Sequence, residues 1–135
     1  MKQEDKELLL KDLSARLPYK PIVHIHDIDV VDYDNYLYPD YFEKMMSNSI
    51  TLKPYLRPMS SMTDEEFGFL QEHLPYDFTR IYSGKFNLID DIHLGNSISI
   101  DDMAFLLDYL NKRHFDYRGL IEKGLAINAT GLNIY

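Results

Sequence analysis

Apolar residues recur at helical spacing in several stretches of the chain, and these stretches predict its helices. The expected helices cover residues 4–17, a short stretch that begins at 40, residues 64–73, about 99–114 and a short stretch over 117–123. Thr63 and Glu66 are spaced as a capping box, which fixes the start of the third helix. Asp40 can cap the second helix, and Gly124 fits a left-handed stop after the last one. The leucines of the first helix form one stripe, away from which lie Lys6, Lys11, Asp12 and Arg16.

Runs of β-branched residues predict the strands. Strands are expected over residues 21–26, 28–33 and 49–53, in a hairpin over 77–89, and in the tail over 125–135. The alternation of apolar and polar residues slips near Asp27, which predicts a turn or bulge there. Pro54 and Pro58 predict that the segment after residue 53 is extended and irregular, or lies at a sheet edge.

Helices and short strands alternate without the regular rhythm of a βαβ fold. We therefore expect an α+β protein with a small, mostly antiparallel sheet and about four or five helices. The length of 135 residues is that of one domain, which we expect to cover residues 1–135. A chain of this length can bury a core, and its 45% hydrophobic content supports this.

Composition narrows the chemistry that is open to the chain. With no cysteine, it has no disulfide, thiol nucleophile or zinc-thiolate site. The start of the sequence lacks the pattern of a signal peptide, and no apolar run is long enough to span a bilayer, so we expect a cytoplasmic protein with no membrane contact. The net charge of −8 does not favour binding to nucleic-acid backbones.

The acidity is concentrated in one stretch, which is also rich in tyrosine. Residues 21–43 contain six acidic side chains and no lysine or arginine. The same stretch contains four tyrosines, Tyr33, Tyr36, Tyr38 and Tyr41. These rings can pack on the core with their hydroxyls in water, or they can form a contact surface for a protein partner or a sugar. Self-association of the chain would also fit such a surface.

His24 and His26 are the candidate metal ligands. On a strand, two histidines at this spacing point to one face, as two ligands of one metal do, and Asp27, Asp29 and Asp32 could add oxygen ligands. A histidine pair of this kind also occurs on the polar face of a half-buried strand, so we commit to no metal and no cofactor. The aspartate spacing does not match a calcium-binding EF-hand loop.

Three stretches resemble segments of a known family: KPYLRPMSSMTDEE at 53–66, HFDYRGLIEKGLA at 114–126 and LLLKDLSARLPY at 8–19. The family consists of small uncharacterised proteins of gut anaerobic bacteria and of their phages and mobile elements. The resemblance implies a bacterial or phage setting in the cytoplasm and no particular activity. Within these blocks, Arg57, His114, Tyr117 and Arg118 either line one ligand groove or belong to a buried joint between two helices, in which Asp116 caps and Phe115 packs.

The sequence favours a non-enzymatic interaction or accessory module of bacterial, phage or mobile-element origin. The candidate binding residues are Tyr33, Tyr36, Tyr38, Tyr41, Arg57, Tyr117 and Arg118. One alternative is a metal-dependent hydrolase that uses His24, His26 and nearby aspartates. Another is an acidic protein that imitates DNA. No phosphate-binding loop, nucleophile elbow or zinc-protease motif is present, so the sequence leans away from an enzyme.

Overall fold

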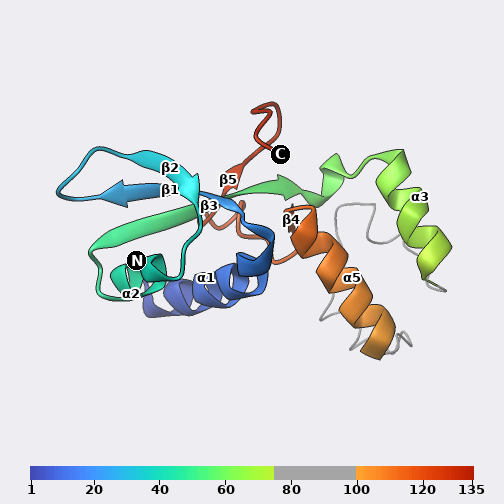
Figure 1. The fold of residues 1–135 in the computed structure, drawn as a ribbon, viewed down its shortest axis with the longest axis horizontal. Coiled ribbons are helices and arrows are strands. Elements are labelled where there is room, and N and C mark those ends of the chain that lie inside the picture. Colours follow the sequence, from blue (N-terminus) through green and yellow to red (C-terminus); the bar gives the residue numbers. More distant parts are fainter. Residues whose placement is uncertain (75–99) are drawn as a thin grey trace.

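The computed structural model describes residues 1–74 and 100–135, and Figure 1 shows its ribbon. The four α-helices in these ranges are α1 (Gln3–Arg16), α2 (Asp40–Met46), α3 (Asp64–His73) and α5 (Ile100–Lys112). The strands are β1 (Ile22–Asp27), β2 (Tyr33–Tyr36), β3 (Ile50–Pro58), β4 (Phe115–Asp116) and β5 (Ile127–Asn128). Short 3₁₀ turns cover Leu17–Tyr19 and Met59–Ser61. The hairpin predicted over 77–89 and the helix start predicted at Ser99 lie outside the described residues.

The five strands form one mixed sheet in which β1 pairs antiparallel with both β2 and β3. After Pro54, which lies opposite the beginning of β1, β3 continues and pairs in parallel with the two-residue strands β4 and β5. The longer pairings are the antiparallel ones. Together with the helices, this arrangement confirms the α+β class.

β3 is one continuous strand, which confirms the extended structure predicted after residue 53, but its second half pairs with β4 and β5 rather than being irregular. The two prolines lie where ladders end. Pro54 is the last partner in the register with β1, and Pro58 is the last in the register with β4. Because proline has no N–H to donate, the end of a ladder is where a strand tolerates it.

The inner face of the sheet packs on α1 and α2, which lie along one side of it in Figure 1. This first core includes Leu9, Leu13, Val23, Ile25, Tyr41, Met45, Leu52 and Leu56. A second core forms where the end of β3 meets α3 and α5, and it includes Met59, Leu70, Leu106, Leu110 and Phe115. Phe115 is fully buried.

The strand predicted over 28–33 is wrong in its position. β2 begins only at Tyr33, and residues 28–32 form the loop that joins it to β1. The turn predicted near Asp27 is confirmed, since the Asp27 carboxylate accepts a hydrogen bond from the backbone N–H of Asp29 at 3.0 Å. The Asp27 carbonyl accepts another from Val30 at 3.3 Å.

Two local predictions near helix ends need correction. Residues 117–123 form hydrogen-bonded turns rather than a helix, although the Asp116 carboxylate accepts hydrogen bonds from the backbone of Leu120 and Ile121 at 2.8 and 2.9 Å. Gly124 ends this segment in the left-handed conformation, as predicted, with φ of 74°. Asp40 is the first residue of α2 and makes no side-chain cap. None of the helices in the described ranges is long and apolar enough to cross a membrane.

Candidate functional site

The outer face of the sheet carries a hydrogen-bonded cluster of two histidines and two aspartates. The Nδ1 atom of His24 lies 2.7 Å from a carboxylate oxygen of Asp34, and its Nε2 atom lies 3.3 Å from Asp32. Asp32 also lies 2.5 Å from the Nδ1 atom of His26. On the neighbouring strand, the Tyr55 hydroxyl donates to Asp34 at 3.0 Å. The cluster therefore ties the loop before β2 to the two strands beside it.

These contacts shift the protonation of the cluster toward ion pairs. The hydrogen bond to Asp34 raises the pKa of His24 above its ordinary 6.5, against the opposing effect of partial burial. The hydrogen bond to His26 lowers the pKa of Asp32. Burial, followed by the contact with Asp34, raises the pKa of Tyr55. His24 in its charged form is thus held between two carboxylates.

His24 and His26 share one face of β1, as the sequence predicted, because Val23 and Ile25 between them face the core. Both ring nitrogens of His24 already lie near carboxylate oxygens. Among the residues that the structure describes, no group of three or more histidines and acidic residues is arranged to hold a metal ion. The geometry here is that of a salt-linked cluster.

The four tyrosines do not form one surface. The register places Tyr33 opposite Ile25 on the inner face of the sheet and Tyr36 opposite Ile22 on the outer face. Tyr41 is buried, and its hydroxyl accepts a hydrogen bond from the Asn35 side chain at 3.1 Å. Tyr38 is exposed and meets the Tyr41 ring edge-on, with the ring centres 5.9 Å apart. Tyr41 thus packs in the core, whereas the other three tyrosines are exposed.

Arg57 is held by an internal partner. Its guanidinium donates to both carboxylate oxygens of Glu66, at 2.8 and 2.7 Å, and lies 4.2 Å from the ring centre of Phe115. Glu66 also completes the capping box with Thr63 at the start of α3. Burial alone would raise the pKa of Glu66, but the bonds from Arg57 and Thr63 outweigh it and lower the pKa. This arrangement supports the structural interpretation of Arg57.

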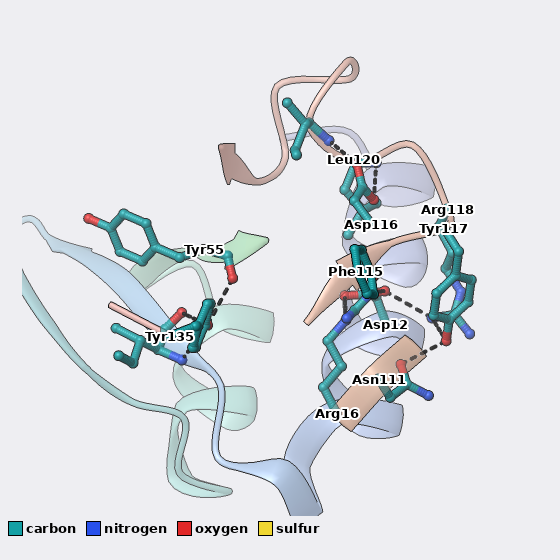
Figure 2. A network of polar contacts seen from close by, with 12 residues as sticks. Asp12, Arg16, Tyr55, Asn111, Phe115, Asp116, Tyr117, Arg118, Leu120 and Tyr135 are labelled. Atoms are coloured by element: carbon teal, nitrogen blue, oxygen red, sulfur yellow. Dashed lines mark hydrogen bonds and ion pairs between the residues drawn. The ribbon is translucent and has the colours of Figure 1, made fainter. Parts of the chain in front are cut away.

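Arg118 and Tyr117 belong to a network that joins α1 to the segment after α5 (Figure 2). Arg118 donates to Asp12 at 2.9 Å and to the Tyr117 hydroxyl at 2.9 Å, and that hydroxyl donates to Asn111 at 2.8 Å. Arg16 donates to Asp12 at 2.8 and 3.1 Å and to the Phe115 carbonyl at 2.6 Å. The sequence offered a joint between two helices as one interpretation, but residues 117–123 are not helical, and these contacts fasten the segment to α1 instead.

Asp12 and Arg16 were expected to lie away from the buried stripe of α1, and this was wrong. Both side chains are fully buried. Their spacing of four residues is the signal that could have indicated a pair, but the same spacing is common on solvent-facing helix surfaces. Lys6 is also buried, and its ammonium contacts the Asn48 side chain.

His114 and Tyr135 form a stacked pair that sequence reasoning missed. Their ring centres lie 3.7 Å apart with planes 11° from parallel. The Tyr135 hydroxyl accepts from the backbone N–H of Ile22 at 2.9 Å and donates to the Tyr55 carbonyl at 2.8 Å, which ties the C-terminal segment to the sheet. Burial, with the cations of Arg16 and Arg57 adding to it, lowers the pKa of His114 to about 4. His114 is therefore neutral near pH 7.

The loop between β1 and β2 presents uncovered aliphatic side chains. Ile28 is 76% exposed, Val30 58% and Val31 79%. In Figure 1 this loop lies at the left-hand end of the molecule, beyond α1 and α2. We call residues 27–32 the hairpin tip. Its sequence alternates acidic and aliphatic residues, with Asp27, Asp29 and Asp32 beside the three apolar side chains.

A cleft of about 440 Å³ lies beside α3 and α5. Its lining includes the Arg57–Glu66 pair, together with Phe69, Tyr109 and Arg113. Phe69 and Tyr109 stack with ring centres 5.1 Å apart, and Arg113 lies 5.6 Å from the Tyr109 ring centre. The cleft has the volume of a small-molecule site. Its lining contains two cations, Arg57 and Arg113, and two carboxylates, Glu65 and Glu66, so its charges balance.

Comparison with known proteins identifies no family for this chain. No family model and no solved structure matches it. The chain is 26% identical over 106 residues to sulfate adenylyltransferase subunit 1 from three strains of Buchnera aphidicola subsp. Acyrthosiphon pisum, Tuc7, 5A and APS. The match covers 73% of this chain and 21% of each relative, so the chain spans about a fifth of the length of these relatives.

Proposed function

We propose that this protein is a non-enzymatic interaction module whose binding element is the hairpin tip. The observation that carries the proposal is the exposure of Ile28, Val30 and Val31, three β-branched side chains within four residues of a loop that nothing in the described structure covers. Isolated exposed aliphatic residues are common, but clustered ones at a projecting loop are typical of contact sites.

Several charged groups of the described residues support the same proposal, because they pair with one another rather than with a substrate. Arg57 pairs with Glu66, Arg118 with Asp12, and both nitrogens of His24 face carboxylates. A general base or a metal ligand needs a free atom directed at a substrate or an ion. The bacterial, phage or mobile-element origin implied by the resemblance stays an expectation. The 26% match to an adenylyltransferase subunit covers too little of that protein to suggest its activity here.

The proposal is tested by site-specific photocrosslinking in cells that naturally carry the gene. Benzoylphenylalanine replaces Val31 in one protein and Ile100, an equally exposed aliphatic residue on α5, in a matched control. We expect one discrete adduct from position 31, identified by mass spectrometry, and its loss when Ile28→Ser is added. Equal labelling from both positions would contradict the proposal. Stoichiometric zinc or manganese in untagged protein that His24→Ala releases would instead favour the metal-enzyme alternative.

A further inference from the structure

The apolar and acidic residues of the hairpin tip also indicate the chemistry of its partner. We propose that it docks end-on against a basic amphipathic helix of another protein, with Ile28, Val30 and Val31 on the apolar stripe of that helix and the aspartates of the tip facing lysines or arginines at its margins. This inference rests on the proposed function and specifies the partner of the same site.

Charge complementarity selects a basic partner. Asp27 and Asp29 lie next to the three aliphatic residues, whereas the charge of Asp32 is already shared with His24 and His26. Residues 21–43 contain no lysine or arginine. A second copy of the chain would bring the same acidic loop to the contact, and like charges facing each other across an interface are unfavourable. An anionic membrane surface would be repelled for the same reason. A helix with an apolar stripe between basic rows complements both features of the tip.

The edge of the sheet beside the tip argues against the addition of a partner strand. β2 is the edge strand and has only four residues. The Leu37 N–H bonds to Pro21 beside β1, so by alternation the N–H groups of Asp34 and Tyr36 point away from β1. The outward N–H of Tyr36 is already bound by the Asn35 side-chain oxygen at 2.9 Å. Short, capped and acidic edges of this kind resist strand pairing, which leaves the tip itself as the contact.

Hydrogen bonds brace both ends of the loop in the absence of a partner. The Asp27 side chain accepts from the N–H of Asp29, and Asp32 bridges the rings of His24 and His26. A loop that is ordered in advance loses less conformational entropy on binding. Three exposed aliphatic residues within four positions of such a loop can therefore act as an anchor.

The test uses two short synthetic amphipathic helices, one of leucine and lysine and one of leucine and glutamate, titrated into the ¹⁵N-labelled full chain. We expect the basic helix to shift the amide signals of residues 27–32 and to bind more weakly as salt rises from about 0.05 M to about 0.5 M. Ile28→Ser should weaken binding about tenfold, which corresponds to burial of most of one aliphatic side chain. The matched change Ile100→Ser should leave it unchanged. Asp29→Asn should weaken it and Glu7→Gln should not.

The outcomes separate this inference from the proposed function. Equal binding of both helices, shifts that map outside 27–32, or equal effects of Ile28→Ser and Ile100→Ser would each overturn the inference. Dimerisation through the tip in sedimentation would overturn it in favour of a second copy. If neither helix binds while position 31 still crosslinks to a partner in cells, the partner chemistry is wrong and the interaction module stands. If the crosslink is also absent, both are wrong.

Discussion

Replacement of Asp12 by alanine should destabilise the protein more than almost any other single change of a charged residue. The Asp12 side chain is fully buried and is the carboxylate that accepts from both Arg16 and Arg118. Its removal leaves the wholly buried guanidinium of Arg16 without a counter-charge. Loss of one partner from a buried pair typically costs about 3–5 kcal/mol, and we expect a loss of that order in the free energy of unfolding.

Urea denaturation followed by circular dichroism measures the effect. With a slope of about 1–3 kcal/mol per molar urea, the midpoint should fall by about 2 M. The matched control is Glu7→Ala on the exposed side of the same helix, which should change stability by no more than about 0.5 kcal/mol. Because the defect is an uncompensated charge, Asp12→Leu combined with Arg16→Met should be less destabilised than Asp12→Ala alone.

Double-mutant cycles measure the two ion pairs of Asp12 separately. The coupling between Asp12 and Arg16 should exceed that between Asp12 and Arg118, since the Arg118 side chain is 19% exposed and water can replace part of its contact. An Asp12→Ala variant that loses no more stability than Glu7→Ala, or couplings in the reverse order, would refute the description of this joint.

Three further predictions concern titration, capping and backbone conformation. NMR titration should give a pKa above 6.5 for His24 and near 4 for His114, and a reversed order would contradict the geometry. The bonds of His24 therefore add stability that is complete below pH 6.5 and fades as pH rises through its raised pKa. Neutral His114 adds stability above pH 6.5 that fades as pH falls toward 4. Thr63→Ala should cost about 1 kcal/mol in urea denaturation through loss of the capping box, and Thr63→Ser should keep most of it. Gly124→Ala should cost about 1–2 kcal/mol in the same assay because φ is 74° there, while Gly68→Ala in α3, where a Cβ meets nothing, should be neutral or stabilising.

Local signals in the sequence were sufficient for α1, α2, α3 and α5, although they also predicted a helix over 117–123 that the structure does not contain. The capping box at Thr63 and the apolar spacing of α1 and α5 act within one or two turns, so a single sequence contains them. Contacts between distant segments were not accessible in this way. The strands β4 and β5 have two residues each and exist because β3 offers them a partner. The link between Arg118 and Asp12 spans 106 positions, and no spacing rule connects them.

The wrong strand prediction and the proposed site have the same origin. Ile28, Val30 and Val31 have high β-propensity, which reflects how well such side chains fit a half-buried pleated surface. The fold places them instead in a loop, exposed and without that benefit. Sequences that violate a local preference without a gain in the folded monomer tend to do so where function requires it. The mismatch between propensity and placement at residues 28–31 is therefore an independent argument for the hairpin tip as the contact surface.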